Sequence, residues 1–587
     1  MKTIDIRRVT VGGEIGRRID ITANHNMMAV DLDKDFILPF QTVWDGAELG
    51  DYVGMGKFID ALSRVAAYLK DEDLIKLNRR IVNAIIDTQE ESGYIGIMPP
   101  EYRIRRLWDI HEMSYMILGL TTDYHYWKEP RTFDALTKLA DYLMARWQEA
   151  PPLASEPVDT VIYDLGSDEA FLALYEETKD RKYLDFVTEF KAFGKWDREI
   201  VKGRHGKVEG HVYDYFCRTE AQLRLFRLKQ ANRMPQAAYR ALDFIMNQDG
   251  MAVTGGIGID ECWHDTQEGK GHLGETCATA YQIRFMHTLL QQTENSIYGD
   301  FIERMIYNAL FAAQSPDGRN LRYYAPFEGE KKYFWLDTYC CPNNFRRILS
   351  ELPGMLYYLS DSGFTVNLYT PSSASLEIDG GVLLHIRQET DYPKSGSIKI
   401  YVDPETPITF ALRLRIPSWC NGATVLVNGR SAELKPLKGS FYEIHRNWRA
   451  CDVVELELPM PFRLIRGRAL QEGKVALMRG PVLFSLSLVR NPSLKDKDIG
   501  GIVIDPASLT SGEDEETIRL NAQVCRVQAW AREPGSDKDS SSHELSLILS
   551  EFPDPNGVAS YFSIPPSHVV ETIDDELINI QVQNFLN

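Results

Sequence analysis

Cysteine is scarce in this sequence, with eight residues among 587, and basic side chains are outnumbered, with 65 lysines and arginines against 84 acidic residues. A disulfide framework needs a far higher cysteine density, so we expect these thiols to be free in a reducing compartment. The formal net charge of −19 disfavours nucleic acid and anionic membranes as partners, because both attract basic surfaces. The net charge does not argue against a neutral substrate.

Long apolar runs are also missing. No apolar run reaches 18 residues, so no transmembrane helix is expected. The opening segment, MKTIDIRRVTVGGEIGRRID, lacks the apolar core that a signal peptide needs. With 44% hydrophobic and 25% charged residues, the composition is that of a folded globular protein. We therefore expect a cytoplasmic protein.

Residues from about 50 to 360 show helical periodicity. In FIERMIYNALFAA (301–313) and KFIDALSRVAAYL (57–69), apolar residues recur three and four positions apart, as on one face of a helix. Similar runs lie at 79–90, 107–120, 132–147, 168–190, 218–229, 235–248 and 278–292. So many amphipathic helices with little strand signal between them predict a helical barrel or stacked helical hairpins.

After Ser360 the spacing of apolar residues changes from the helical period to every second residue. Apolar and polar residues alternate in SIKIYVD (397–403), ITFALRLRIP (408–417) and VVELELPMPF (453–462), with turn pairs between strands. Successive strands and turns of this kind predict a β-sandwich. Since one core seldom exceeds roughly 300 residues, we assign 1–360 to a helical catalytic domain, 361–480 to a β-sandwich domain, and 481–587 to a second β-sandwich or a continuation of the first.

Cys340 and Cys341 are adjacent, which makes a disulfide between them strained, because neighbouring Cα atoms lie only about 3.8 Å apart. A metal can accept both sulfurs. Glu275 and Cys277 in the segment GETCATAY would complete a set of three thiolates and one carboxylate for tetrahedral zinc. The alternative is that these are separate small core residues, since free cysteine is among the most buried residue types.

Several motifs together resemble glycoside hydrolase family 127, the β-L-arabinofuranosidase-like family. The segments that carry the resemblance are GGIG (255–258), ETCA (275–278), CCPNN (340–344), LPGMLYYLSDSGFTVNLY (352–369) and LRIPSW (414–419). DFILPFQ, WDGAELGDYV and the closing β region are also similar, so the resemblance covers most of the chain.

The resemblance implies an (α/α)6 helical barrel followed by β-sandwich domains. It implies a Zn²⁺ ion bound by Glu275, Cys277, Cys340 and Cys341, with Cys340 also the nucleophile that forms a thioglycosyl-enzyme and reacts with net retention. Glu261, in the turn GGIGIDECWHD, matches the family's general acid/base. A partly apolar pocket beside Cys262 and Trp263 would raise the pKa of Glu261 and suit it to that task. The alternative for Glu261 is a solvated loop acid.

Other polar and aromatic residues are candidate sugar contacts. His211 resembles a histidine that the family places against the sugar, and His111 lies on a matching helix, although either one also fits a satisfied core position. Four aromatic residues, Tyr323, Tyr324, Trp44 and Trp108, are further candidates that core packing explains nearly as well.

Two positions depart from the family pattern. Leu118 and Ser167 stand where family members carry substrate-facing histidines, and each unmade polar contact costs about 1–3 kcal/mol. We therefore expect the chemistry to be retained and the sugar to be shifted.

The expected function is hydrolysis of a terminal β-L-arabinofuranoside or a related rare plant-cell-wall sugar from a small oligosaccharide or glycoside, by a protein that the resemblance implies is a homodimer. One alternative is the same chemistry on another pectin sugar such as aceric acid. Others are a non-catalytic carbohydrate-binding protein with a structural zinc, and a hydrolase or lyase that uses carboxylates alone.

Overall fold

The structure is a computed structural model that describes thirteen stretches of the chain. These are residues 1–42, 52–104, 107–149, 166–205, 207–231, 233–361, 363–432, 434–495, 498–513, 519, 522–531, 544–565 and 571–581.

The helical half contains the predicted helices, with ends set by local capping. The run predicted over 79–90, for example, begins earlier because the Asp71 side chain accepts hydrogen bonds from the first-turn amides of Asp73 and Leu74. The helices are α1 (Gly13–Ile21), α2 (Leu38–Gln41), α3 (Met55–Leu69), α4 (Glu72–Ile86), α5 (Leu107–Trp127), α6 (Pro130–Glu149), α7 (Ser167–Thr178), α8 (Arg181–Asp185), α9 (Val212–Leu228), α10 (Gln236–Asn247), α11 (Thr276–Thr293), α12 (Ile297–Met305) and α13 (Cys340–Glu351).

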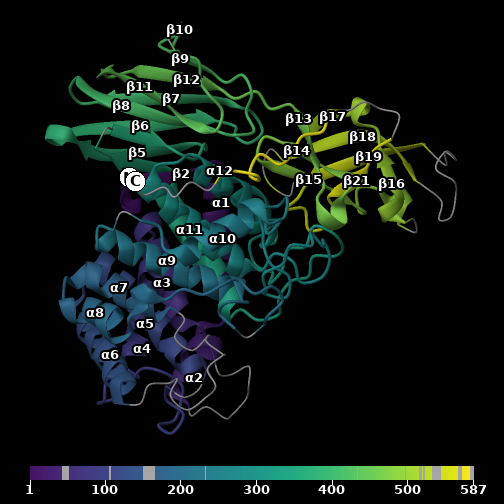
Figure 1. The fold of residues 1–587 in the computed structure, drawn as a ribbon. Coiled ribbons are helices and arrows are strands. Elements are labelled where there is room, and N and C mark those ends of the chain that lie inside the picture. The colour runs from purple at the N-terminus through teal and green to yellow at the C-terminus, as the bar shows by residue number, and fades with distance from the viewer. Residues whose placement is uncertain are drawn as a thin grey trace.

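Six of the described helices close into a ring. Helices α3, α5, α7, α9, α11 and α13 pack in that order, and α13 returns to pack on α3. Each of α4, α6, α8, α10 and α12 packs on the ring helix that precedes it in the chain. The helical domain lies below the β domains in Figure 1. The ring gives the molecule a polar interior lined by alternate helices.

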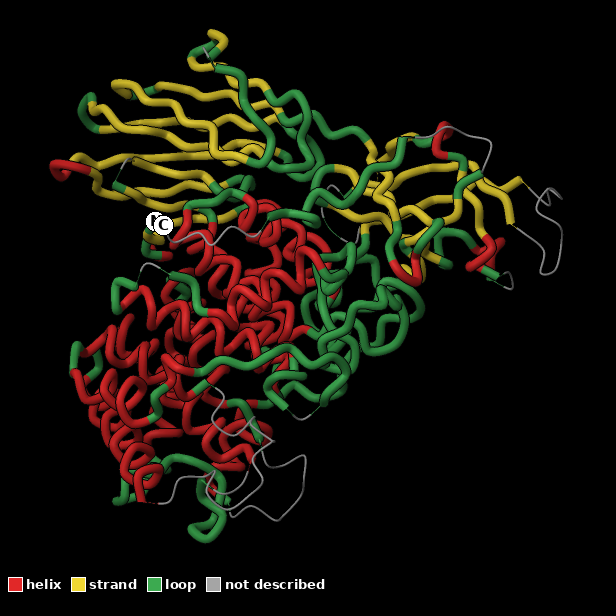
Figure 2. The backbone as a smooth tube through the Cα atoms, in the orientation of Figure 1, coloured by secondary structure: helices red, strands yellow, loops and turns green. Residues whose placement is uncertain are grey.

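The first β domain is a sandwich of a five-stranded and a seven-stranded sheet (Figure 2). Its sheet orders are β1-β3-β4-β8-β11 and β10-β9-β12-β7-β6-β5-β2. The strands are β1 (Lys2–Thr3), β2 (Val9–Val11), β3 (Tyr357–Ser360), β4 (Gly363–Val366), β5 (Ser372–Ile378), β6 (Val382–Thr390), β7 (Ser397–Pro404), β8 (Ile408–Ile416), β9 (Thr424–Val427), β10 (Arg430–Ser431), β11 (Ser440–Trp448) and β12 (Asp452–Glu457).

The N-terminal residues correct the predicted domain division. The sequence predicts one helical domain over 1–360, but β1 pairs with β3 and β2 pairs with β5. Each short strand covers an outer edge of one sheet, where unpaired backbone groups would otherwise remain.

The C-terminal region is not a second sandwich. Strands β14, β21, β16, β18, β19 and β15 pair in that order, and β15 returns to β14, which closes a six-stranded barrel. The predicted boundary at residue 480 falls in the β14–β15 hairpin, inside this barrel. The strands are β13 (Phe462–Arg466), β14 (Lys474–Arg479), β15 (Val482–Ser487), β16 (Ile502–Ile504), β17 (Thr510–Glu513), β18 (Gln523–Ala531), β19 (Glu544–Glu551), β20 (Gly557–Ala559) and β21 (Tyr561–Ser563).

Buried polar contacts join the domains. Arg415 of β8 pairs with Asp300 and Glu303 of α12, and all three side chains are at most 2% exposed. Asn308 donates a hydrogen bond to the Pro481 carbonyl in the barrel, at 2.9 Å. Within the described residues, every helix is too short or too polar to cross a membrane.

Candidate active site

Glu275, Cys277, Cys340 and Cys341 meet in one buried cluster. One donor atom from each residue lies within 4.8 Å of the donors of the other three. The Cys277 and Cys341 Sγ atoms are 3.1 Å apart, and Cys341 Sγ lies 3.4 Å from the Glu275 carboxylate. Cys340 is 6% exposed, more than the other three. The set that the sequence proposed is therefore brought together in space.

The cluster sits where two ring helices begin. Glu275 and Cys277 stand at the start of α11, and the two adjacent cysteines are the first residues of α13. Pro342 in the first turn of α13 is compatible with a helix start, because the amides there have no helical partner. The partial positive charge of both helix N-termini favours carboxylate and thiolate forms.

Glu261 lies beside the cluster on a loop that pairs with the segment before α9. Val212 donates its amide to the Glu261 carbonyl at 2.8 Å, and Trp263 donates to the Gly210 carbonyl at 3.0 Å. Glu261 adopts a left-handed backbone with φ 65°, which is uncommon for a residue with a side chain. This pairing places His211 Nε2 3.0 Å from the Glu261 carboxylate.

The pKa of Glu261 differs from the sequence expectation. Burial raises it, but hydrogen bonds from His211 and Tyr323 and the charge of His211 outweigh burial and lower the pKa to about 2. The predicted raised pKa is therefore wrong. Trp263 packs against Phe216 and Phe244 in the core, at ring distances of 5.3 and 5.1 Å.

His211 carries the proton of this pair. Burial lowers its pKa, but the charge of Asp214 and the hydrogen bond to Glu261 raise it to about 10. Its Nδ1 atom lies 3.7 Å from Asp214, so the imidazolium stands between two carboxylates. His205 also approaches Glu261, at 3.2 Å.

Tyr323 connects Glu261 with Cys340. Its hydroxyl donates to Glu261 Oε1 at 2.5 Å and lies 3.5 Å from Cys340 Sγ. Tyr324 makes a longer contact to the same oxygen, at 3.4 Å. Both tyrosines are placed by the segment that runs antiparallel to Glu275, in which Thr276 donates its amide to the Tyr323 carbonyl at 2.9 Å.

His111 is fully buried. Its Nε2 atom accepts from the Lys57 ammonium at 3.2 Å, and Lys57 also donates to the Tyr213 hydroxyl at 3.0 Å. Burial and the Lys57 charge lower the pKa of His111 well below its ordinary value, so it is neutral. Burial also lowers the pKa of Lys57, while the sulfurs of Cys277 and Cys340 oppose this effect.

Aromatic rings line the region around His111. Trp108 stacks on Tyr52 at 5.2 Å and meets Tyr339 edge-on at 6.1 Å. Tyr339, directly before Cys340, has φ 82° and ψ 177°, a conformation that costs about 1–3 kcal/mol and occurs at functional sites. Trp44, the other predicted tryptophan, lies outside the described residues.

Leu118 and Ser167, which stand where family members carry histidines, are both buried. Leu118 lines a cavity at the far end of the ring, together with Glu351 at the carboxyl end of α13. Ser167 is fully buried, and its hydroxyl lies 2.5 Å from the Lys191 ammonium.

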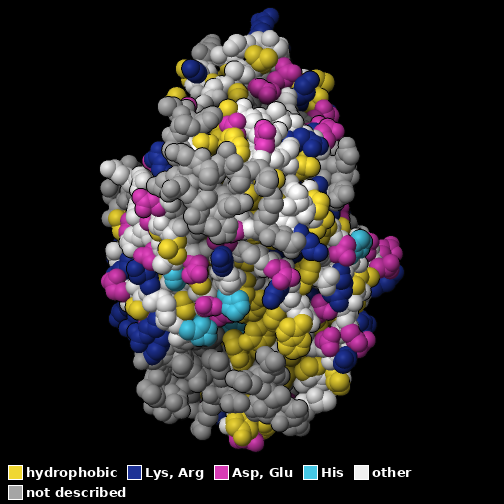
Figure 3. All heavy atoms as spheres, turned by 90° about the vertical axis from the view of Figure 1, so that its right-hand side faces the viewer, with side chains coloured by type: hydrophobic (Ala, Val, Ile, Leu, Met, Phe, Trp, Pro, Cys, Tyr) yellow, Lys and Arg dark blue, Asp and Glu magenta, His cyan; other side chains and the backbone are white. Residues whose placement is uncertain are grey.

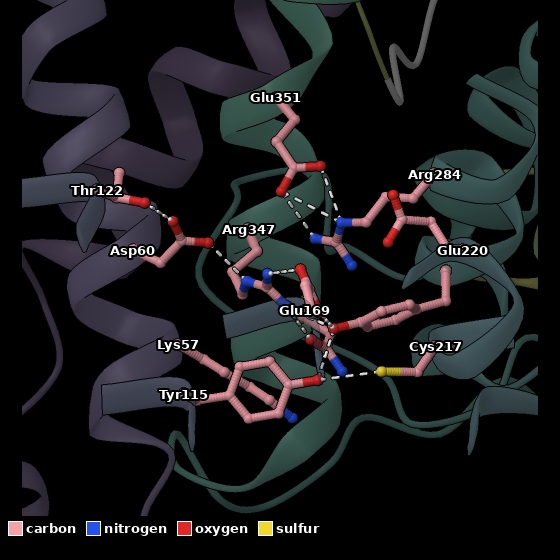
Figure 4. Close-up of polar contacts among 12 residues, drawn as sticks. Lys57, Asp60, Tyr115, Thr122, Glu169, Cys217, Glu220, Arg284, Arg347 and Glu351 are labelled. Atoms are coloured by element: carbon pink, nitrogen blue, oxygen red, sulfur yellow. Dashed lines mark hydrogen bonds and ion pairs between the residues drawn. The ribbon is translucent and has the colours of Figure 1, made fainter. Parts of the chain in front are cut away.

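A polar network in the ring supports the cluster from behind. Asn344 Nδ2 donates to Cys277 Sγ at 3.1 Å, and Asn344 Oδ1 accepts from Arg347 at 3.3 Å. Arg347 in turn pairs with Asp60 of α3 at 2.7 Å and Glu169 of α7 at 3.0 Å. Figure 4 shows the part of the network around Arg347, to which all six ring helices contribute a side chain. It fixes the start of α13 relative to the other helices.

Sequence reasoning missed several of these neighbours. Asn344 carried a signal, since it is the last residue of CCPNN. Lys57 and Tyr213 carried none, because only the ring packing brings α3 and α9 to the same point.

Comparison with known proteins places this site in a family. Residues 19–354 match the family profile described as β-L-arabinofuranosidase, GH127 catalytic domain, and residues 363–460 match its middle domain. The chain belongs to glycoside hydrolase family 127. This family 127 protein is therefore a glycoside hydrolase.

A curated relative and two solved structures are similar along most of the family 127 chain. The non-reducing end β-L-arabinofuranosidase of Bifidobacterium longum subsp. longum is 25% identical over 509 residues, which are 74% of this chain and 75% of the relative. The structure of Ara127N-Se, a GH127 β-L-arabinofuranosidase from Geobacillus stearothermophilus T6, is 21% identical with a TM-score of 0.80, covering 95% of this chain and 100% of that one. The GH127 β-arabinofuranosidase BT3674 is 21% identical with a TM-score of 0.82, covering 96% and 98%. These structures support the helical domain followed by β-rich domains.

Proposed function

We propose that this family 127 enzyme is a retaining exo-glycosidase that removes a terminal β-L-arabinofuranose, or a related rare plant-cell-wall sugar, through Cys340. The observation that carries the proposal is the position of the Tyr323 hydroxyl, which contacts both Cys340 Sγ and Glu261 Oε1. A nucleophile and an acid/base held around one point are what a double displacement at a glycosidic bond requires. The Bifidobacterium relative is a non-reducing end β-L-arabinofuranosidase, which supports the same sugar.

The residues present fit a zinc ion. Three sulfurs and one carboxylate form a donor set that zinc accepts, and their donor atoms lie within 4.8 Å of one another. Among the described residues, Glu275 Oε2 is buried without a hydrogen-bond partner, and Asn344 donates to Cys277 as an outer-shell ligand partner would. When bound, zinc would keep the coordinating thiols deprotonated.

The first step forms a thioglycosyl-enzyme. Cys340 Sγ attacks the anomeric carbon, the bond from that carbon to the leaving oxygen breaks, and Glu261 gives its proton to this oxygen. In the second step Glu261 accepts a proton from water, the water oxygen attacks the anomeric carbon, and the sulfur–carbon bond breaks. Two displacements at the same carbon give net retention.

Glu261 needs a proton before the first step. The raised pKa of His211 and the lowered pKa of Glu261 put the proton of this pair on His211, 3.0 Å from the carboxylate. We assign His211 the role of supplying that proton to Glu261 and of holding the carboxylate in place. His205 and Tyr323 would exchange their hydrogen bonds to Glu261 for contacts with the substrate as it enters.

The remaining predicted sugar contacts are part of the same proposal. His111 and Trp108 are assigned to the wall of the sugar pocket. We also propose that the six-helix ring and the helices packed on it form the (α/α)6 barrel that the family resemblance implies.

A single assay series tests the proposed function. Purified protein is given nitrophenyl and oligosaccharide β-L-arabinofuranosides together with glycosides of other pectin sugars, including aceric acid, and zinc is measured on the same sample. We expect hydrolysis of terminal β-L-arabinofuranosides, one zinc per chain, and a first-formed sugar of β configuration by NMR. A first-formed α anomer would contradict retention, and activity confined to another pectin sugar would contradict the assigned substrate.

A further inference from the structure

A cleft of about 600 Å³ opens directly beside the catalytic group. Tyr323 and Tyr324 line it, and the same two hydroxyls contact Glu261 Oε1 at 2.5 and 3.4 Å. The outer wall consists of Pro326, Glu330 and the run Lys332–Phe334. In Figure 3, hydrophobic side chains gather beside histidines on the face of the molecule that carries these loops. The cleft is therefore continuous with the site.

The proposed reaction determines which part of the substrate lies in the cleft. In the proposed function the leaving oxygen lies between Cys340 and Glu261, because one attacks the anomeric carbon and the other protonates that oxygen. Whatever is bonded through this oxygen must then extend past Glu261, away from the sulfur. Tyr324 stands on that side, since it contacts Glu261 and lines the cleft. The cleft is where the leaving group of the substrate would lie.

Two aromatic rings in the cleft are backed by other planar groups. Tyr324 stacks on the His272 imidazole at 4.5 Å with an interplanar angle of 12°, and His272 is held by Asp260 at 2.7 Å. Tyr333 lies over the buried Arg322 guanidinium at 4.0 Å and is itself 40% exposed. Each ring thus has one supported face and is oriented before any ligand binds. Such faces suit the C–H surface of a sugar ring.

The C-terminal barrel anchors the cleft wall. The buried Lys331 ammonium donates to the carbonyls of Phe552, Asp554 and Gly557 at 3.0–3.2 Å. Gly329 donates its amide to the Val558 carbonyl at 2.8 Å. Lys331 lies between Glu330 and Lys332 of the outer wall, so these contacts fix the wall's position. Preorganisation of this kind reduces the entropy lost on binding.

Two charged side chains complete the wall. Glu330 and Lys332 are exposed at the cleft, and among the described residues neither side chain has a hydrogen-bond or ion-pair partner. A carboxylate and an ammonium near aromatic faces offer an acceptor and donors for sugar hydroxyls.

We propose that this cleft is a leaving-group subsite that binds a pyranose ring, with Tyr324 and Tyr333 as its stacking platforms. The proposal rests on the proposed function, because that function sets the direction of the leaving group. It makes the substrate a glycoside of another sugar residue rather than of a small alcohol.

The kinetic test compares two substrates with similar alkyl leaving groups. One is methyl β-L-arabinofuranoside, and the other is a disaccharide in which the same sugar is linked to a galactopyranose. We expect the wild type to favour the disaccharide in kcat/KM. Tyr333→Ala should lower the ratio of the two kcat/KM values about tenfold, mainly through the KM of the disaccharide, and Tyr333→Phe should restore it. An unchanged ratio in Tyr333→Ala would overturn the subsite.

A binding measurement separates failure of the subsite from failure of the proposed function. Saturation-transfer NMR with methyl pyranosides of D-galactose and D-galacturonate needs no turnover. Ring-proton signals in the wild type that disappear in Tyr333→Ala support the subsite even if no substrate is hydrolysed. Signals that are absent in the wild type, or equal in both proteins, overturn it. Phe190→Ala, which removes an exposed aromatic ring of the helical domain, is the matched control and should change neither readout.

Discussion

Tyr323 places its hydroxyl 3.5 Å from Cys340 Sγ. The same hydroxyl donates to Glu261 at 2.5 Å, so one group spans the proposed nucleophile and the proposed acid/base. The two residues come from different parts of the chain, and Tyr323 is positioned by its pairing with the start of α11.

Removing that hydroxyl should slow the reaction without removing the metal. In Tyr323→Phe we expect kcat/KM to fall about 100-fold, as for loss of one preorganised donor, with zinc content unchanged. Tyr324→Phe should cause a smaller fall, because its contact to Glu261 is 3.4 Å. Equal losses in the two variants, or loss of zinc in Tyr323→Phe, would contradict the assigned role.

Asn344 should control metal retention. Its amide donates to Cys277 Sγ at 3.1 Å, and loss of such an outer-shell bond lowers metal affinity about 10- to 100-fold. Asn344→Ala should therefore release zinc at a lower chelator concentration, measured by competition with a chromogenic chelator. Cys217→Ser is the control, because this buried thiol contacts Tyr115 at 3.7 Å outside the cluster. Equal zinc retention in Asn344→Ala and the wild type would be inconsistent with this role.

Arg347 should be a main determinant of stability. It is 1% exposed and pairs with Asp60 and Glu169, so its removal leaves the buried Glu169 without its arginine and Asp60 with Arg64 alone. We expect Arg347→Met to cost about 3–5 kcal/mol, seen as a clear fall in melting temperature. Arg79→Met removes an arginine that is 58% exposed and pairs with Glu129 at 3.4 Å, and it should change stability by less than about 0.5 kcal/mol. Similar losses in both variants would show that the ring network adds nothing.

Glu220 should make stability depend on pH. Burial and the nearby Glu169 raise its pKa to about 7, against 4.5 for the ordinary group. Between these values the folded protein binds more protons than the unfolded chain, so stability should fall as pH rises from about 4.5 to about 7. Melting temperatures across this range should show a smaller fall in Glu220→Gln, which does not titrate. An identical pH profile in the two proteins would contradict the raised pKa.

The helices and strands were predictable from the sequence because burying one face of an element makes its apolar residues recur at a fixed spacing. The runs at 57–69 and 301–313 are helical, and those at 397–403 and 408–417 are strands. The short β1 and β2 were not predictable, since two or three residues show no period. Barrel closure was missed as well, because the β15 to β14 pairing depends on the paths of strands between them.

The candidate site was predictable as a set of residues and less so as an electrostatic environment. Glu275 and Cys277 could be matched with the cysteine pair by chemistry alone. The low pKa of Glu261 could not be predicted from the sequence, since it arises from His211 and Tyr323, which are 50 and 62 positions away. The residues next to Glu261 in the sequence, Cys262 and Trp263, suggested a raised pKa instead of a lowered one.

Cys340 is the residue to which we assign the bond to the sugar. Glu261→Gln should be mixed with a nitrophenyl β-L-arabinofuranoside, whose activated leaving group needs no acid, so that the intermediate accumulates while the base of the second step is missing. After an acid quench, peptide mass spectrometry should place one sugar residue on Cys340, with fragment ions separating it from Cys341. A burst of nitrophenol with the sugar on Cys341, on a carboxylate, or on no residue would contradict the claim.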